Sequence, residues 1–404
     1  MTAEATPGAG ALADLRVVEM GQLLAGPFCA QLLGDFGAEV IKLESPGTGD
    51  PMRQWGREQS NGASLWWPVV ARNKKSVTCN LRDPEGQRLA RELIAQADIV
   101  IENFRPGTME RWGLGYDRLR EGNPELIMVR VTGYGQTGPY APRAGYGSIG
   151  EAMGGIRYTT GDSGHRPART GISIGDSLAA VFATIGTLAA VHHREKTGQG
   201  QVVDSAIYEA VLAMMESLLP EYALTGYQRE RTGSVLPNVA PSNVYPTADG
   251  EMVLIAANQD TVFARLTELM DRPELAVDER YRSHTARGAR MTELDDLISA
   301  WTAGHDAEPL LAKLHEGGVP AGRIYTARDM FADPHFAARE AIVRVAHPEL
   351  GELPMQNVFP KLSVTPGRVR HAGPALGEHN AAVYGELLGL DADQLAKLAE
   401  TGVI

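Results

Sequence analysis

Cysteine is scarce in this chain: only Cys29 and Cys79 occur among 404 residues. Two cysteines so far apart provide neither a disulfide framework nor a cysteine-based metal site. We expect both thiols to be reduced and buried, which fits the reducing interior of a cell. The scarcity of cysteine therefore argues against a small disulfide-stapled scaffold and predicts a cytoplasmic protein.

Positive charge is also in short supply. Lysine and arginine number 38, against 50 aspartates and glutamates, which gives a formal net charge of −12. Non-specific binding to nucleic acid needs a basic face, so this balance argues against a nucleic-acid partner. It still permits an anionic small molecule, because a local basic pocket can exist on an acidic protein.

Long uninterrupted apolar runs are lacking too. The longest, residues 178–191, is broken by Thr184, Gly186 and Thr187, and it is shorter than the ~20 residues that span a bilayer. Residues 1–14 are small and polar, without the basic start and apolar stretch of a signal peptide. We therefore expect no membrane segment and no secretion signal.

Alternating strand and helix patterns fill the first part of the chain. Residues 15–45 indicate a strand, a helix that opens at Gly26-Pro27 and ends at Gly37, and a second strand. Such a unit predicts a parallel sheet with right-handed crossovers, that is, an α/β fold. The same alternation continues with strands at 76–81, 98–102 and 126–131 and helices at 84–96, 177–194 and 205–218.

The length exceeds one ordinary hydrophobic core and suggests roughly two or three lobes. Residues 229–249 are rich in proline, glycine and asparagine and are typical of a linker. Residues 250–325 combine one strand with several helices, as expected for a second, smaller domain. The tail shows few strong elements, and we expect it to pack back on the first lobe. The predicted division is therefore 1–225, 226–330 and 331–404.

Asp176 stands between a glycine and a long predicted helix. An acid at the start of a helix caps free N–H groups and suits the helix dipole. A carboxylate there is also a known kind of covalent catalyst, and Gly175 would let a ligand approach the backbone closely. The local residues are compatible with both interpretations.

Gly133, Gly135 and Gly138 have the spacing of a dinucleotide fingerprint, but Pro139 follows and no helix clearly starts there. The required strand–helix context is missing, which leaves a mobile turn or a flap over a ligand. Several basic residues are either a solvated face or a phosphate cradle: Arg72, Lys74, Lys75, Arg82, Arg105 and Arg111.

His192 and His193 are adjacent on a predicted helix, so they point to different helix faces. No cysteine or carboxylate motif accompanies them, and we predict no metal site.

A series of short motifs carries a resemblance to a known family. They are Ala25-Gly26-Pro27, residues 34–42, Gly49-Asp50-Pro51, Asn73-Lys74-Lys75-Ser76, residues 102–107, Gly133-Tyr134-Gly135, Gly175-Asp176, residues 196–201, residues 318–322 and Gly377-Glu378-His379. On these motifs, from about Leu15 to His379, the chain resembles the class III coenzyme A transferases, also called the CaiB/BaiF family. The resemblance implies a Rossmann-like large domain built from both ends of the chain, a smaller α+β domain between them, and an intertwined homodimer.

The resemblance also implies a mechanism without metal or redox cofactor, in which coenzyme A is a substrate. Asp176 would attack an acyl-CoA thioester and pass through aspartyl anhydride and aspartyl-CoA thioester intermediates. The CoA contacts that carry over are Leu24, Ala25, Cys79, Arg82, Asn103, Phe104, Arg105, Arg111, Gly145 and Tyr146.

Departures from the formyl-CoA:oxalate transferases bear on the substrate. Those enzymes have Gln where Leu24 stands and Arg where Ser45 stands, and residues 237–241 replace their glycine-rich loop. Residues 216–222 and 238–243 are more similar to transferases that use succinyl-CoA and other dicarboxylates. We therefore expect succinyl-CoA as donor and a small carboxylic or dicarboxylic acid as acceptor.

Two rival functions remain. The α-methylacyl-CoA racemases are similar in fold but use a His base where Tyr146 stands here, and tyrosine, with a pKa of about 10, is a poor base at neutral pH. A non-enzymatic CoA-binding protein would keep the basic pocket without needing Gly175-Asp176.

Overall fold

The computed structural model describes residues 10–57, 59–60 and 62–404. It divides into two compact units. The large unit comprises residues up to 157, 170–220 and 335–404, and the small unit comprises residues 158–169 and 221–334. The chain passes between the units at four points, and short helices span three of them: α7 (Ile156–Thr159), α10 (Leu218–Thr225) and α16 (Pro334–Ala338).

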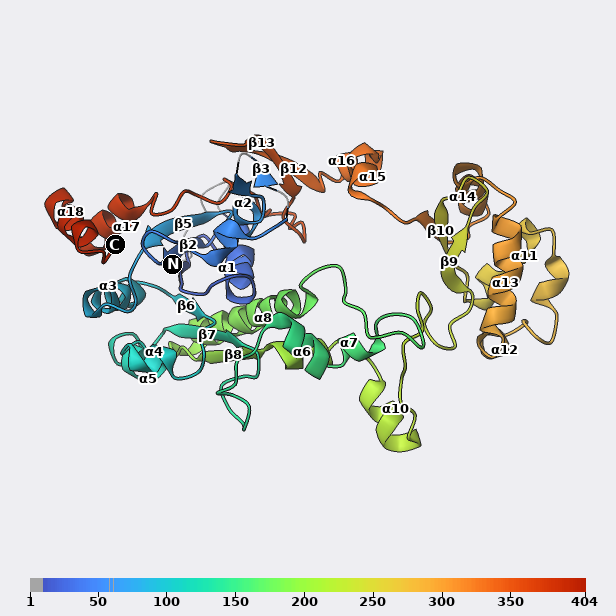
Figure 1. Ribbon diagram of the computed structural model, residues 1–404, viewed down its shortest axis with the longest axis horizontal. Helices are drawn as coiled ribbons and strands as arrows, with labels where there is room; N and C mark the ends of the chain where they lie inside the picture. Colours follow the sequence, from blue (N-terminus) through green and yellow to red (C-terminus); the bar gives the residue numbers. More distant parts are fainter. Residues whose placement is uncertain (1–9, 58, 61) are drawn as a thin grey trace. The chain divides into compact units, whose positions relative to one another are not determined.

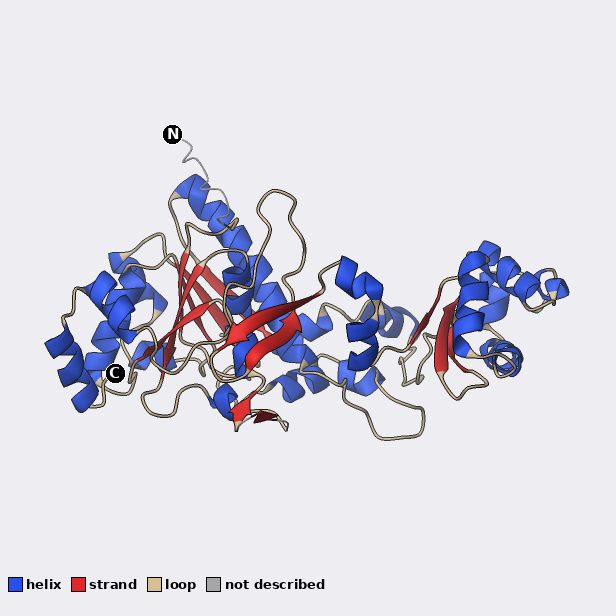
Figure 2. Ribbon diagram, turned by 90° about the horizontal axis from the view of Figure 1, so that it is seen from above, coloured by secondary structure: helices blue, strands red, loops and turns tan. Residues whose placement is uncertain are grey.

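A six-stranded parallel sheet forms the centre of the large unit, in the order β5-β2-β1-β6-β7-β8. Figure 2 draws the strands in red and the helices in blue. In register, Val18 lies opposite Ile41 on one side and Val100 on the other. This confirms the predicted α/β class. The strands are β1 (Arg16–Glu19), β2 (Glu39–Glu44), β5 (Lys74–Thr78), β6 (Ile99–Glu102), β7 (Ile127–Thr132) and β8 (Val202–Ala206).

Helices cover both faces of this sheet because successive strand residues point to opposite sides. Val17 belongs to one hydrophobic core and Val18 to the other. Facing the first core are α1 (Ala25–Asp35), α8 (Ile174–Thr197) and α9 (Ile207–Leu212). Facing the second are α3 (Pro84–Ala95), α5 (Tyr116–Gly122), α17 (Asn380–Leu388) and α18 (Ala392–Glu400).

Helix α8 is the central helix of the first core. Its buried face carries Ala179, Ala180, Ala183 and Ala190, which let α1 approach closely. Among the described residues, α8 is the one helix long and apolar enough to cross a membrane by length and composition. Core helices of soluble proteins can have the same length and apolar composition, and the alanine face of α8 packs in a hydrophobic core.

Two expectations about secondary structure were wrong. Residues 205–218 are not one helix, because Val202–Ala206 form the edge strand β8 beside β7 and only Ile207–Leu212 continue as α9. The tail is also more ordered than expected: β12 (Ile342–His347) and β13 (Gly351–Gln356) form an antiparallel hairpin, and α17 and α18 follow. Pairing across the sheet overrides local preference in short segments of this kind.

The C-terminal part closes the outer edge of the sheet at β5, where α17 lies beside β5 and α3 (Figure 1). Ser76 N donates to His379 Nδ1 at 3.2 Å, and Thr78 N donates to Asn380 Oδ1 at 2.8 Å. Asn80 N donates to Val403 O at 2.8 Å. Edge amides that would otherwise be open are therefore paired with residues about 300 positions later.

The short elements of the large unit are η1 (Pro51–Gln54), β3 (Gln59–Ser60), β4 (Ala63–Ser64), α2 (Trp67–Val70), α4 (Thr108–Arg111) and α6 (Gly147–Met153).

The small unit has its own core and an antiparallel sheet in the order β11-β10-β9. Arg287 is fully buried there and donates to the carbonyl oxygens of Ala240, Tyr281 and Asn258 and to Asp260. The elements are β9 (Ser242–Pro246), β10 (Met252–Ala256), β11 (Ala321–Arg323), α11 (Asp260–Leu269), η2 (Pro273–Ala276), α12 (His284–Gly288), α13 (Met291–Thr302), α14 (Ala307–Glu316) and α15 (Ala327–Ala332).

Candidate active site

A cavity of about 590 Å³ opens at the carboxyl ends of β1, β2, β5 and β6. Open α/β sheets bind ligands at this edge. Four of the predicted CoA contacts line the cavity: Cys79, Arg82, Phe104 and Arg105. The remaining lining residues include Gln22, Ser45, Asn80, Thr108 and Trp112.

The cavity joins an aromatic wall to exposed guanidinium groups. Phe104 and Trp112 meet edge to face, with ring centroids 5.0 Å apart. Arg82 and Arg105 are exposed on the rim. Arg111 is also exposed, and its guanidinium donates to Oγ1 of the lining residue Thr108 at 2.9 Å. An apolar slot beside several guanidinium groups suits an adenine ring and phosphates.

Cys79 contributes packing rather than reactivity. Its side chain is 2% exposed, and its Sγ contacts Gly86 O at 3.2 Å. Burial raises the pKa of the Cys79 thiol to about 12. The thiol is therefore neutral at physiological pH and is a poor nucleophile.

The β1–α1 loop, residues 20–24, borders the cavity and is fixed by hydrogen bonds to Asn103. Asn103 Oδ1 accepts from Gln22 N at 2.8 Å, and Asn103 Nδ2 donates to Gln22 O at 2.8 Å. Leu24 caps α1 and packs on Met52 and Trp67, and Ala25 begins the helix. In the described part of the chain, Leu24, Ala25 and Asn103 are thus neighbours of the cavity wall rather than part of its lining.

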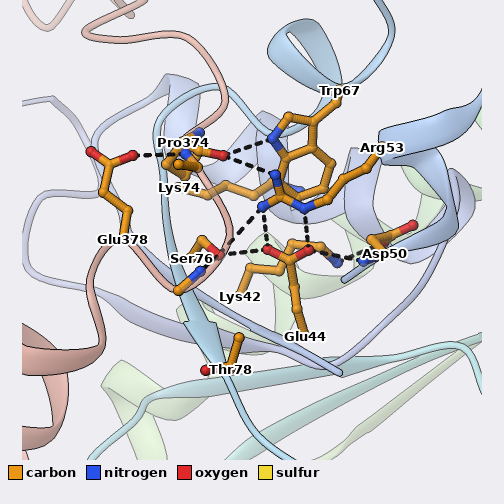
Figure 3. A network of polar contacts seen from close by, with 12 residues as sticks. Lys42, Glu44, Asp50, Arg53, Trp67, Lys74, Ser76, Thr78, Pro374 and Glu378 are labelled. Atoms are coloured by element: carbon orange, nitrogen blue, oxygen red, sulfur yellow. Dashed lines mark hydrogen bonds and ion pairs between the residues drawn. The ribbon is translucent and has the colours of Figure 1, made fainter. Parts of the chain in front are cut away.

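A buried network of charges lies beneath this loop (Figure 3). Lys42 Nζ contacts Glu19 Oε1 at 2.9 Å, Asp50 Oδ2 at 2.9 Å and Gly21 O at 2.8 Å. Lys74 Nζ contacts the other Glu19 oxygen at 3.1 Å. It also donates to the carbonyl of Pro27 at 2.6 Å. All four charged side chains are at most 1% exposed.

Glu44 and Arg53 extend the network toward the C-terminal part. Arg53 donates to both carboxylate oxygens of Glu44, at 2.8 and 2.7 Å, and to Pro374 O at 3.2 Å (Figure 3). Ser76 Oγ donates to Glu44 at 2.6 Å. Three cations then face three carboxylates, so the buried network, hereafter the charge network, carries no net charge.

Pairing within the charge network outweighs burial for several groups. Burial alone would raise the pKa of Glu44, but Arg53 and Lys42 hold it below its ordinary value. Burial acts the same way on Asp50, and Lys42 lowers its pKa in turn. Burial would lower the pKa of Lys42, yet Glu19 and Asp50 raise it above the ordinary range. These groups therefore stay ionised near neutral pH.

Three members of the basic cluster do not serve a phosphate cradle. Arg72 pairs with Asp35 at 2.6 Å inside the protein, and Lys74 belongs to the charge network. Lys75 pairs with Glu39 at 2.6 Å. Only Arg82, Arg105 and Arg111 of that cluster lie at the cavity. Alternation along β5 could have separated Lys74 from Lys75, because neighbours on a strand point to opposite faces.

Asp176 lies in the first turn of α8 and is partly buried. Its carboxylate packs on the backbone of Gly147: a Cβ placed on that glycine would be 2.1 Å from Asp176 Oδ2. A Cβ on Gly175 would be 3.0 Å from Gly147 O and 3.1 Å from Glu151 Cγ. We call Gly147, Gly175 and the adjoining turn of α6 the glycine seat.

Gly145 and Tyr146 lead into the glycine seat. A Cβ on Gly145 would be 2.9 Å from Gly133 Cα, so the two glycine-rich segments touch backbone to backbone. Tyr146 is the N-cap residue of α6 and is 64% exposed. These residues gather around Asp176, and none of the three is among the described residues that line the 590 Å³ cavity.

The described residues contain no group of three His, Cys, Asp or Glu side chains that could hold a metal ion.

Comparisons with known proteins agree with this architecture. The sequence profile of CoA-transferase family III matches residues 12–380. Succinyl-CoA–D-citramalate CoA-transferase of Chloroflexus aurantiacus is 61% identical over 393 residues, covering 97% of this chain and 98% of the relative. Succinate–glutarate CoA-transferase of Agrobacterium fabrum is 37% identical, covering 93% of this chain and 95% of the relative.

A solved structure supports the same assignment. The crystal structure of a CaiB/BaiF family protein from Brucella suis superposes with a TM-score of 0.83 at 36% identity, covering 94% of this chain and all of the other. The similarity extends over both compact units and includes the Asp176 region, because the profile spans nearly the whole chain. The chain therefore belongs to CoA-transferase family III.

Proposed function

We propose that this enzyme transfers coenzyme A from succinyl-CoA to a small dicarboxylic acid of four or five carbons. The observation that carries the proposal is 61% identity, over nearly the full length, to a succinyl-CoA–D-citramalate CoA-transferase. Relatives named for L-malate, glutarate and mesaconate support the same acceptor class at 37–43% identity.

Asp176 is the proposed nucleophile. Its carboxylate attacks the succinyl thioester, the C–S bond breaks, and an aspartyl–succinyl anhydride forms with release of CoA thiolate. The thiolate attacks the aspartyl carbonyl, which releases succinate and leaves an aspartyl-CoA thioester. The acceptor carboxylate then displaces the thiolate to give a second anhydride, and the thiolate attacks the acceptor carbonyl. Product acyl-CoA leaves, and the Asp176 carboxylate is restored.

The position of Asp176 supports this role. Asp176 lies in the first turn of α8, and a helix N-terminus stabilises developing negative charge. Each exchange step conserves charge and oxidation state, so we propose that the reaction needs neither a metal nor a redox cofactor.

The cavity is the proposed site of the nucleotide end of CoA. Arg82, Arg105 and Arg111 provide cations at its rim, and Phe104 with Cys79 provides apolar wall. The remaining expected contacts would serve the reacting end of the thioester: Leu24, Ala25, Asn103, Gly145 and Tyr146.

We further propose a cytoplasmic, intertwined homodimer whose large domain is Rossmann-like and is built from both ends of the chain, with the small domain between them. Numbered by order in the chain, the sheet reads 3-2-1-4-5-6, the order of doubly wound nucleotide-binding sheets. The side of α8 opposite the alanines exposes Val181, Ile185 and Leu188, which a second subunit would bury. A solution mass of one chain at micromolar concentration contradicts the dimer.

The substrate proposal is tested by a screen of acceptor acids. Purified enzyme is incubated with succinyl-CoA and a panel of C2 to C6 mono- and dicarboxylates, and the acyl-CoA products are identified by mass spectrometry. We expect transfer to C4 and C5 dicarboxylates and little to oxalate. Preference for formyl-CoA with oxalate contradicts the substrate proposal.

Asp176→Ala and Asp176→Asn should lower transfer by several orders of magnitude while CoA binding, measured by calorimetry, is retained. Hydroxylamine added during turnover should convert Asp176 to a hydroxamate. A folded Asp176→Asn enzyme with near-normal transfer, after deamidation has been excluded, contradicts the mechanism. Exchange of the substrate α-hydrogen with deuterated solvent, without CoA transfer, would instead identify a racemase.

A further inference from the structure

The carboxylate of Asp176 occupies space that most side chains at position 147 would fill. A Cβ on Gly147 would lie 2.1 Å from Oδ2, 2.7 Å from Cγ and 3.0 Å from Oδ1 of Asp176. Real Cβ atoms essentially never approach a heavy atom closer than 3.0 Å. The three nearest atoms all belong to the one side chain that the proposed mechanism uses.

Backbone conformation does not require glycine at this position. Gly147 is the first residue of α6 and is not among the glycines with positive φ. Alanine is also favoured over glycine within a helix by up to about 1 kcal/mol. The need for glycine here is therefore steric and comes from the Asp176 carboxylate.

Helix α6 has little freedom to move away from a methyl group. Its face toward α9 is also built of glycine: a Cβ on Gly150 would be 2.5 Å from Ile207 Cγ2, and one on Gly154 would be 2.6 Å from Val211 Cβ. The face toward α8 is closed as well, since Gly175 lies against Gly147 O. Because α6 is packed between α8 and α9, an added methyl group on Gly147 would displace the Asp176 side chain rather than the helix.

We propose that Gly147 is a positioning residue for the nucleophile: by lacking a side chain, it sets the resting orientation of the Asp176 carboxylate. Adding one methyl group must move Oδ2 from 2.1 Å to at least the 3.4 Å at which ordinary contact begins, and misplacement of a reacting group by only about 1 Å already costs on the order of 10²-fold in rate. The inference rests on the proposed role of Asp176 and adds a residue that acts through it.

The first test compares Gly147→Ala with Gly122→Ala, a control in the last turn of α5 where a Cβ meets nothing within 4 Å. We expect Gly147→Ala to lower kcat by about 10²-fold and to leave KM for acyl-CoA within about twofold, and the control to change neither. The yield of hydroxamate at Asp176 should fall with kcat. A kcat within threefold of wild type, or a Gly147→Ala protein that does not fold, overturns the proposal.

A second test uses stability and does not depend on turnover. In an Asp176→Ala background the clashing atoms are gone, so Gly147→Ala should be more favourable for folding there than in the wild type. A double-mutant cycle read by urea denaturation isolates this coupling. Purely additive effects overturn the inference. If Asp176→Ala retains transfer, the proposed mechanism fails instead, and the cycle still reports whether Gly147 orients the carboxylate.

Discussion

Two regions of the large unit prepare the proposed site in opposite ways. The charge network holds the β1–α1 loop by adding groups: Lys42 and Asp50 each reach a backbone atom of that loop. The glycine seat holds Asp176 by omitting groups, at Gly147 and Gly175. We therefore expect the charge network to be disrupted when one charged partner is removed, and the glycine seat to be disrupted when an atom is added to a glycine.

The largest effect is expected from Lys42→Met, which breaks the charge network. Glu19 and Asp50 would stay buried with one cation fewer, and stranding a buried charge costs about 3–5 kcal/mol. The free energy of unfolding in urea measures this loss. Lys75→Met is the control, because its pair with Glu39 is about one-third exposed and exposed pairs contribute less than about 1 kcal/mol. Equal losses in the two variants would show that burial of the network is unimportant.

The next effect concerns packing below the glycine seat. Gly150→Ala would press a methyl group against Ile207, and overpacking of this kind costs about 1–3 kcal/mol. Thermal unfolding should report the loss. Gly122→Ala should change little, because its surroundings are open. A stabilised Gly150→Ala protein would mean that α6 and α9 separate easily, which would also weaken the argument about Gly147.

Asn103→Ala should change substrate binding more than chemistry. It removes two hydrogen bonds that fix Gln22, together worth about 1–2 kcal/mol. KM for acyl-CoA should therefore rise about tenfold, with kcat retained. Asn123→Ala is the matched control, since Asn123 also makes two hydrogen bonds to backbone but at a distance from the cavity. An unchanged KM in Asn103→Ala would show that the loop does not need this support.

The smallest effect is a dependence of stability on pH. The pKa values of Glu44 and Asp50 lie below their ordinary values of 4.5 and 3.8 when the protein is folded. Their contribution to stability is thus present above those values and is lost as pH falls through the folded pKa values. Urea midpoints should begin to fall below about pH 4.5. Glu44→Gln should flatten that slope, and an unchanged slope would contradict the ionised pair with Arg53.

The sequence was sufficient for the βα alternation but not for most side-chain roles. Apolar residues 15–20 and the break at Gly37 locate β1 and α1 because local patterns follow the period of each element. Strand β8 was not predicted from the sequence. Its five residues, which include the polar Asp204, form a strand because they pair with β7. Short edge strands depend on tertiary context in this way.

In the candidate site, too, local sequence identified single residues but not their partners. Asp176 was singled out because a motif marks it, and its place at a helix start followed from the local sequence. The partner of its carboxylate, Gly147, lies 29 positions away on another helix, and nothing in the spacing indicates which glycine faces which residue. Likewise Lys42 belongs to a motif and to a predicted strand, but the sequence does not indicate its partners, which come from neighbouring strands and loops.

The way the sheet edge is completed bears on how the protein is made. Ser76 and Thr78 find their partners 303 and 302 residues later in the chain. At ribosomal rates of about 5–20 residues per second, about 15–60 seconds separate the synthesis of β5 from that of the segment that covers it. During that interval the nascent strand presents unpaired amides, with the small unit still emerging behind it. An open strand edge favours aggregation, so we expect expression at lower temperature or with added chaperone to improve the soluble yield.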